Sequence, residues 1–152
     1  WYDGQAEDAA RHYVSLLPDS DINRIVRSPA DTPSGPAGMV LVVEFTLCGS
    51  PFIALNGGPQ YRFTEAVSFQ IPCADQAEVD RLWTALSDGG SEGRCGWLKD
   101  RFGFSWQIVP SRFFELMELG SDTQRQAVMV AMMGMIKFDV SGLEAAFEAA
   151  KA

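Results

Sequence analysis

Polar side chains alternate with apolar ones in two short segments, and these are the first residues that could do chemistry. Ser105 and Gln107 share one face of the segment 104–109, and Ser68 and Gln70 are spaced in the same way between apolar residues. Because successive side chains of a strand point to opposite faces, each segment is predicted to be a strand with one polar face. Hydroxyl and amide groups on such a face can hold a small ligand by hydrogen bonds. A sheet face that simply meets solvent would show the same pattern.

Asn56 and Trp97 are two further candidates for contact with a ligand. Asn56 ends a predicted apolar strand, where its amide could orient a ligand or could instead cap the turn at Gly57 and Gly58. Trp97 could stack on a flat ligand, although aromatic side chains also dominate protein cores.

Side chains that carry protons or bind metals are scarce in this chain. His12 is the only histidine and lies in the middle of a predicted helix, so we interpret it as structural. Glu44 interrupts an apolar strand and could be a buried base, but an edge or interface position is the simpler explanation. Three cysteines without a CxxC motif indicate small buried thiols rather than disulfides or a zinc site: Cys48, Cys73 and Cys95. Such thiols are typical of a reducing cytosol.

The composition is that of one ordinary globular domain. The chain has 152 residues, of which 47% are hydrophobic and 21% charged, and its formal net charge is −8. Nucleic acids and anionic membrane surfaces attract clustered Lys and Arg, so we expect neither as a partner. No segment approaches the roughly 20 apolar residues of a spanning helix, and no signal peptide is visible. We therefore expect a cytoplasmic protein.

The hydrophobic pattern predicts both helices and strands. Apolar residues recur at helical spacing in 6–17 and 76–86, and Asp3 is predicted to cap the first of these helices. Capping boxes that begin at Ser121 and at Ser141 predict two more helices near the C-terminus. Apolar and β-branched runs predict strands at 22–26, 39–47, 52–56, 66–71, 94–99 and 104–109.

Two hairpins are expected among these strands. Antiparallel pairing in the first brings one face of 52–56 against Phe45 and Val43. The second hairpin turns at Lys99–Asp100–Arg101, a charged run that we interpret as solvent-exposed.

The chain also repeats itself weakly. Gln5-Ala6-Glu7 opens the first helix and Gln76-Ala77-Glu78 opens the second, and each helix follows a strand and precedes shorter ones. One such unit cannot cover both faces of its own sheet. Two of them are therefore expected to form one curved sheet with the helices outside and a cleft inside.

Four segments, taken in order, closely resemble a known family. They are WYDGQAEDAARHYVSLLPDS, PFIALNGGP, FTEAVSFQIPCADQAEVDRLWTAL and GRCGWLKDRFGFSWQIVP. They resemble the PhnB-like branch of the vicinal oxygen chelate superfamily, which includes glyoxalase I, bleomycin-resistance proteins and extradiol dioxygenases. The resemblance covers nearly the whole chain, C-terminal helices included, and implies paired βαβββ modules, a bacterial source and a homodimer. Members are often labelled 3-demethylubiquinone 3-methyltransferase, but this chain has no glycine-rich strand-to-helix turn for a nucleotide-like cofactor.

The same resemblance implies where a metal centre would lie. Metal enzymes of the superfamily use four His or Glu ligands, two from each module. The first position falls near or before Trp1, the second near Asn56, the third near Ala66, and the fourth at Gln107, where metal-binding relatives carry Glu. Alanine offers no ligand and amide oxygens are weak ones. We therefore predict no cofactor and treat a divalent metal as a disfavoured alternative.

Together these observations predict an α+β fold: two paired βαβββ modules form a curved mixed sheet around a cleft, and C-terminal helices follow. Module one spans about 1–60, module two about 64–110, and the helical extension 111–152. The cleft is predicted to bind a small, partly apolar molecule, and no catalytic residue is assigned. Its predicted lining is Asn56, Ser68, Trp97, Ser105 and Gln107.

Two alternative functions stay open. One is a metal-dependent isomerase or dioxygenase with a ligand upstream of Trp1. The other is a protein-interaction module that uses the Met-rich C-terminal helices. The sequence is compatible with an enzyme and with a protein that only binds.

Overall fold

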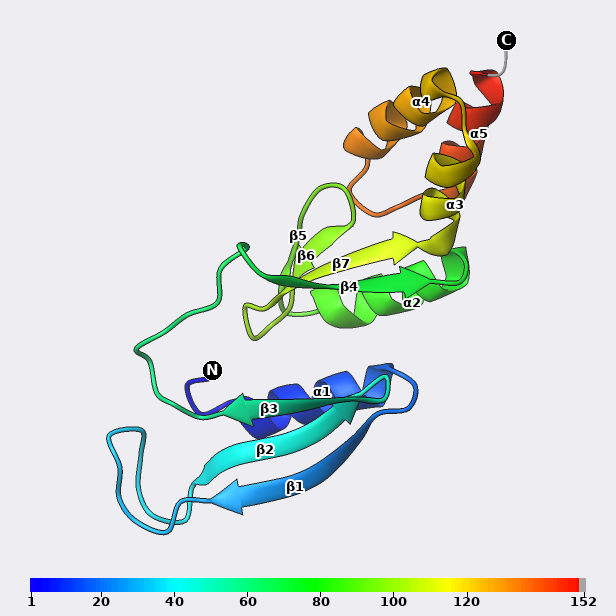
Figure 1. Cartoon of the computed structure of the whole chain (residues 1–152). Helices are drawn as coiled ribbons and strands as arrows, with labels where there is room; N and C mark the ends of the chain where they lie inside the picture. The colour runs from blue at the N-terminus through cyan, green and yellow to red at the C-terminus, as the bar shows by residue number, and fades with distance from the viewer. Residues whose placement is uncertain (151–152) are drawn as a thin grey trace. The chain divides into compact units, whose positions relative to one another are not determined.

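Each half of the chain forms its own β-sheet with one helix packed on it (Figure 1). The computed structural model describes residues 1–150. It divides into two compact units, Trp1–Phe63 and Thr64–Ala152. The first unit holds an antiparallel sheet and the second a mixed sheet followed by three helices, which confirms the predicted α+β class. No helix among the described residues is long and apolar enough to cross a membrane.

The first unit is a three-stranded sheet with a helix on one face. Its elements are α1 (Ala6–Leu16), β1 (Asp21–Arg27), β2 (Val40–Leu47) and β3 (Ser50–Leu55), in the sheet order β1-β2-β3. Phe45 pairs with Phe52 and Val43 pairs with Ala54, which confirms the predicted register. This face of the sheet is almost fully buried because α1 packs on it with its own apolar side. Tyr2 adds a single parallel bridge beside β3, at Asn56.

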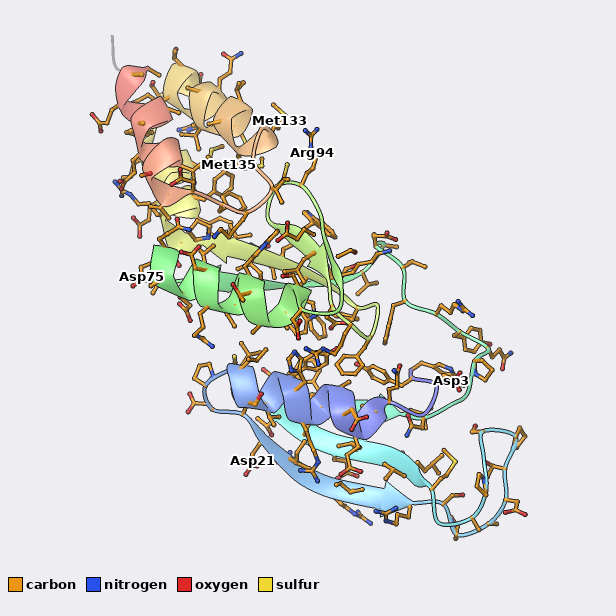
Figure 2. The ribbon with its side chains drawn as sticks, turned by 180° about the vertical axis from the view of Figure 1, so that it is seen from behind. Asp3, Asp21, Asp75, Arg94, Met133 and Met135 are labelled. Atoms are coloured by element: carbon orange, nitrogen blue, oxygen red, sulfur yellow. The ribbon has the colours of Figure 1, made fainter. Side chains whose placement is uncertain are left out.

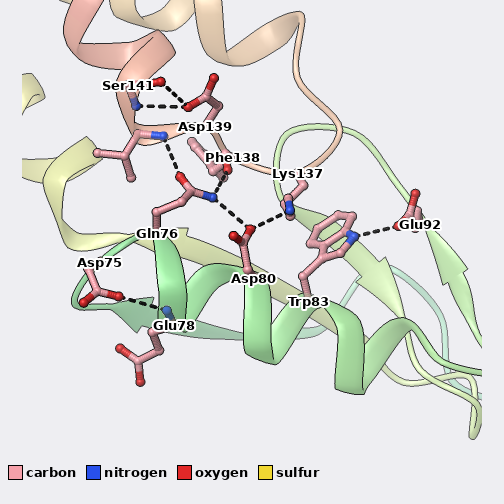
Figure 3. Close-up of polar contacts among 11 residues, drawn as sticks. Asp75, Gln76, Glu78, Asp80, Trp83, Glu92, Lys137, Phe138, Asp139 and Ser141 are labelled. Carbon is pink, nitrogen blue, oxygen red and sulfur yellow. Dashed lines mark hydrogen bonds and ion pairs between the residues drawn. The ribbon is translucent and has the colours of Figure 1, made fainter.

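The start of α1 differs from the prediction. Asp3 does not cap this helix, and neither does the side chain of Gln5 at the N-cap position. Instead, the backbone N–H of Ala6 donates to Oδ1 of Asn56 over 2.9 Å, so the cap comes from a residue 50 positions away. The second helix is capped locally, as its sequence suggests, because the N–H of Glu78 donates to Oδ1 of Asp75 (Figure 3).

The tight turn between β2 and β3 corrects the expectation that all three cysteines are buried. Cys48 and Gly49 have φ values of +47° and +77°, as a two-residue hairpin turn requires, and this places Cys48 in solvent. Only Cys73 is buried, and Cys95 is intermediate. Burial raises the pKa of the Cys73 thiol to about 12, so this thiol stays protonated and unreactive near neutral pH.

The second unit is a four-stranded mixed sheet. Its elements are β4 (Ser68–Cys73), α2 (Gln76–Ser87), β5 (Ser91–Glu92), β6 (Trp97–Lys99) and β7 (Ser105–Pro110), in the order β4-β7-β6-β5. The strand β4 runs parallel to β7, and the other pairs are antiparallel. The apolar face, with Trp106 and Ile108, is buried under α2. The strand β5 was not predicted, because two residues are too few to show alternation.

The two units share one topology. In each, the extended segment before the helix pairs in parallel with the end of the last strand: in the first unit this is the single bridge of Tyr2 with Asn56, and in the second the strand β4 pairs with β7 up to Cys73 and Pro110. The separation of Tyr2 from Cys73 equals that of Gln5 from Gln76 in the sequence repeat. The structure therefore reproduces the predicted βαβββ pattern in both halves.

Three helices extend the chain beyond β7. They are α3 (Ser111–Leu119), α4 (Asp122–Met133) and α5 (Val140–Ala149), and they pack on one another near the carboxyl end of β7 (Figure 1). The capping box of Ser121 with Gln124 is confirmed. The box predicted at Ser141 is wrong, because α5 begins two residues earlier and Asp139 caps it by accepting from the N–H of Ser141.

The turn between β6 and β7 is not the solvated charged run that was expected. Asp100 is 2% exposed. Its carboxylate accepts hydrogen bonds from the N–H of Phe102 at 2.8 Å, the N–H of Phe104 at 3.0 Å and Nε1 of Trp106 at 2.8 Å. Hydrogen bonds to a charged acceptor in a buried place are strong ones. The Asp100 carboxylate therefore closes this hairpin and fixes the indole of Trp106 in the core.

Replacement of Asp100 by alanine is expected to lower the free energy of unfolding by about 3 kcal/mol, because three buried donors lose their acceptor. Urea unfolding followed by tryptophan fluorescence measures the effect. The matched control is Asp88→Ala, which removes an exposed ion pair with Arg101 and should change stability by no more than about 0.5 kcal/mol. Equal effects of the two substitutions would contradict this account of the turn.

Candidate functional site

Four of the five residues predicted to line a ligand site lie on one face of the second sheet. Ser68 pairs in register with Ser105 across β4 and β7, and Trp97 pairs with Gln107 across β6 and β7. Residues paired in register point to the same side of a sheet. The strands therefore gather these four side chains on the face opposite to the one that α2 covers.

The side chains of Gln107 and Ser68 are joined directly. Nε2 of Gln107 donates to Oγ of Ser68 over 2.9 Å, between residues 39 positions apart. Both side chains are half-buried. This hydrogen bond fixes the orientation of the Gln107 amide on the polar face.

Ser105 differs from its neighbours because its hydroxyl has no partner. The residue is 1% exposed, and its Oγ makes no hydrogen bond to any residue that the structure describes. A buried hydroxyl without a partner costs about 1–3 kcal/mol of stability. Such a group is unusual in a folded protein and marks a place where another molecule can supply the missing hydrogen bond.

A hollow of about 210 Å³ lies beside Ser105, with Trp97 and Leu98 also in its wall. The ion pair between Lys99 and Glu65 stands at the same hollow. The hydrogen bond from Lys99 holds the pKa of the Glu65 carboxyl below its ordinary value, so this carboxyl stays ionised at neutral pH.

Glu92 also lines the hollow, but its carboxylate accepts from Nε1 of Trp83 on α2, and its pairing with Leu98 turns it to the face that α2 covers. On the polar face the charges of Lys99 and Glu65 compensate each other, so the hollow offers an aromatic wall and neutral hydrogen-bonding groups there.

The loop that leads into β6 is held tightly at two glycines. A Cβ on Gly93 would lie 2.8 Å from the carbonyl oxygen of Trp97, and one on Gly96 would lie 2.8 Å from the carbonyl oxygen of Ile108. Gly96 also has φ of +79°, a conformation that L-residues avoid. The backbone around Trp97 therefore admits no side chain at either position.

Asn56 belongs to the first unit, whereas the other four predicted residues belong to the second. It is 2% exposed and sits on the face of its sheet that α1 covers. Its Oδ1 accepts from the N–H of Ala6, and its Nδ2 donates to the carbonyl oxygen of Val40 over 2.9 Å. These two bonds leave one donor and one acceptor position of the amide unused, and Asn56 also lines a hollow of about 330 Å³ in the first unit. A role for Asn56 in binding stays a prediction.

The two titratable residues weighed as bases have structural positions. His12 is half-buried on α1, with its ring 6.1 Å from that of Tyr13. Glu44 was expected at an edge or an interface, but it lies on β2, the central strand of the first sheet. It occupies the face away from α1 and pairs in register with Arg24, so an opposite charge stands across the ladder.

The residues at the implied metal positions do not fit a metal centre. Ala66 has no ligand atom, Oδ1 of Asn56 accepts from a backbone N–H, and the Gln107 amide donates to a serine. Asn56 in the first unit corresponds to Pro110 in the second, as the pairing of the last strands shows. Gln107 lies three residues before Pro110, so its counterpart is Ile53, three residues before Asn56, which also lacks a ligand atom. Among residues 1–150, no group of three or more His, Cys, Asp or Glu side chains is placed to hold a metal ion.

The comparisons with known proteins identify the family. The model of a family described as 3-demethylubiquinone-9 3-methyltransferase matches residues 1–109. The chain belongs to this family. A solved PhnB protein from Bacillus cereus that carries the same methyltransferase label is 30% identical to the chain, with a TM-score of 0.66 over 72% of this chain and 94% of that one. These matches confirm the PhnB-like branch of the glyoxalase superfamily.

A second solved structure shows the fold alone. A protein from Pseudomonas aeruginosa is 19% identical to the chain, with a TM-score of 0.59 over 72% of this chain and 91% of that one. No curated protein matches the chain. The family model ends at residue 109, so the expectation that the resemblance extends through the C-terminal helices is not supported: α3, α4 and α5 lie outside the matched part.

Neither residue of the ion pair at the hollow was among the predicted site residues. Lys99 was assigned to an exposed turn, and Glu65 fell in a segment expected to be a loop. Neither shows a periodic signal in the sequence. Only the pairing of Lys99 with Ser105 in the β6–β7 ladder reveals that Lys99 belongs to the polar face.

Two serines of this face should respond in opposite ways to truncation. Ser105→Ala removes a buried hydroxyl without a partner, so the free energy of unfolding should stay within about 0.5 kcal/mol of the wild type or rise. Ser68→Ala leaves Nε2 of Gln107 without its acceptor and should lower the free energy of unfolding by about 1 kcal/mol. Urea unfolding of both variants makes the comparison. A loss on Ser105→Ala as large as that on Ser68→Ala would mean that the Ser105 hydroxyl is bonded within the protein.

Proposed function

We propose that this chain is a small-molecule-binding protein of the glyoxalase fold, and that the polar face of its second sheet holds the ligand without a His/Glu metal centre. The observation that carries the proposal is the Ser105 hydroxyl, which is buried without a partner beside a hollow walled by Trp97. A protein retains such an unfavourable group when a bound molecule satisfies it.

The chemistry of the hollow favours a small, flat and uncharged ligand. The indole of Trp97 can cover one face of an aromatic ring. The Ser105 hydroxyl can both donate and accept a hydrogen bond, and Lys99 and Glu65 already neutralise each other. The hollow of about 210 Å³ is smaller than the roughly 300–1,000 Å³ of pockets for drug-sized molecules, so it suits a single ring with one polar substituent.

The residues present support binding more than turnover. The hollow has no histidine, and its Glu65 carboxyl has a lowered pKa, which makes it a weaker base than an ordinary glutamate. Its second carboxylate, that of Glu92, is bonded to the indole of Trp83. A metal-independent binder needs neither an acid nor a base. The family is labelled a methyltransferase, but this chain lacks the glycine-rich turn that would bind a nucleotide-like cofactor. The label is therefore not extended to this protein.

We also propose that the protein is a cytoplasmic homodimer, as its resemblance to the family implies. The apolar residues Val130 and Met133 of α4 and Ile136 just after it are more than half exposed, which makes this end of α4 a candidate for contact with another protein, a second copy included. Light scattering of the full-length protein measures the mass. A monomer at micromolar concentration would overturn the dimer, and a dimer that persists in Val130→Ser/Met133→Ser would exclude α4 from its interface.

The ligand proposal is tested with three probes that share one ring and differ in the charge of the head group: benzamide, benzoate and benzylammonium. Benzamide is expected to bind best in calorimetric titrations, because Lys99 and Glu65 compensate each other on the polar face of the hollow. Ser105→Ala should lower the affinity for benzamide by at least about fivefold, which is the contribution of one hydrogen bond. Trp97→Ala should lower it by about tenfold.

The matched control for this titration is Ser50→Ala, an exposed serine on β3 of the first unit, which should leave the affinity unchanged. The proposal fails if none of the three probes binds, or if binding is the same in Ser105→Ala and Trp97→Ala as in the wild type. A rise in melting temperature with Zn²⁺ or Mn²⁺ would instead support the metal-dependent alternative.

A further inference from the structure

The segment between α4 and α5 reaches back to the loop that precedes Trp97. The backbone N–H of Cys95 donates to the carbonyl oxygen of Met135 over 2.9 Å, and the N–H of Gly96 donates to that of Ile136 over 2.8 Å. Figure 2 shows Met135 and Arg94 in this region of the second unit. These bonds attach the C-terminal extension to the backbone of the module.

The same segment is bound to α2 by side chains (Figure 3). The amide of Gln76 donates from Nε2 to the carbonyl oxygen of Phe138 over 3.0 Å and accepts at Oε1 from the N–H of Val140 over 2.8 Å. The amide thus bonds the backbone of this segment through one donor and one acceptor, as a neighbouring strand would. Lys137 adds an ion pair with Asp80, one turn further along α2.

The ring of Phe138 rests directly on Gly96. Phe138 is 2% exposed, and a Cβ on Gly96 would lie 2.5 Å from a carbon of its ring. On its other side the ring packs against Phe113 of α3, with 5.4 Å between the centroids. The extension is therefore attached at three places, through the 95–96 backbone, through Gln76 and through Phe138.

This attachment ends one residue from the wall of the hollow. Gly96 precedes Trp97, and the carbonyl oxygen of Gly96 accepts from the N–H of Ile108 over 2.8 Å. The N–H of Gly93 donates to the carbonyl oxygen of Trp97 over 2.8 Å, which closes the loop around the tryptophan. Any shift of Gly96 must move Trp97, because a closely packed loop has no free volume to absorb it.

From these contacts we infer that the C-terminal extension positions Trp97 in the ligand hollow, with Phe138 and Gln76 as the positioning residues. This inference rests on the proposed function. It adds a part of the chain that controls the site from outside the family match, because the family model stops at residue 109. The match to the Bacillus cereus protein takes in 94% of that chain, which leaves it little length for a comparable extension. Because coupling is reciprocal, a ligand that stacks on Trp97 must also favour the docked extension.

Two glycine substitutions provide a matched test in the full-length protein. Gly96→Ala and Gly103→Ala introduce the same side chain at φ values of +79° and +85°, so the backbone strain is similar. A Cβ on Gly96 displaces Phe138 but also meets the carbonyl oxygen of Ile108, whereas one on Gly103 meets nothing within 4 Å. Phe138→Ala, which removes the ring and leaves this carbonyl oxygen untouched, is therefore measured beside Gly96→Ala and should lower the affinity for benzamide as well. Gly96→Ala is expected to lower the affinity for benzamide by at least about tenfold, and Gly103→Ala is expected to lower it by less than about twofold.

A second readout follows the extension without any ligand. In a Cys48→Ser background, Cys95 is the accessible thiol, because Cys73 is buried and protonated near neutral pH. Gly96→Ala and Gln76→Ala should raise the rate at which Cys95 reacts with a disulfide reagent by about tenfold, since each releases the segment that covers it. Asp75→Ala, which removes only the cap of α2, should not raise this rate.

The two readouts separate the possible failures. Unchanged Cys95 reactivity in both variants would overturn the attachment itself. Faster Cys95 reaction with undiminished benzamide affinity would overturn the positioning role and leave the proposed function intact. A wild type that binds none of the three probes would defeat the proposed function and, with it, the role of Trp97, whatever the thiol rates show.

Discussion

The parallel pairing of β4 with β7 determines what the second unit can do. It brings the strand before α2 beside the strand after the hairpin, in a register that sets Ser68 against Ser105. Because the side-chain period of a strand is two, a shift of one residue would turn the polar residues under α2 and the aromatic residues outward. The register therefore creates the buried core and the polar face in one step.

Other contacts of this unit hold that register in place. The carboxylate of Asp100, in the turn between β6 and β7, accepts a hydrogen bond from the indole of Trp106 on β7, and this bond fixes β7 relative to the turn. The hydrogen bond between Gln107 and Ser68 joins the same two strands on the opposite face. The hydroxyl of Ser105 is buried without a partner on this polar face, and for this reason we assign the ligand to it.

Local patterns predicted much of this architecture, and distant contacts account for what they missed. Strict alternation gave the polar face around Ser105 and the register of Phe45 with Phe52. The cap of α1 could not be predicted, because Asn56 is 50 residues from the helix it serves and the adjacent glycines suggested a local turn. Asp100 was assigned to solvent because its donors, among them Trp106, fold back onto it only once the hairpin forms. The hollow beside Trp97 depends on ladder pairing that carries no local signal.

The glycines around Trp97 also bear on how this site can evolve. At Gly93 and Gly96 the obstacle to a side chain is backbone, which cannot move aside as a flexible side chain can. Mutations at these positions lower stability as well as binding, so selection for folding also acts against them. Diversification of the ligand among descendants of this gene is therefore confined to Trp97 and the residues that share its ladder, where substitution leaves the main chain undisturbed. The hollow can change its chemical preference while its outline is inherited unchanged.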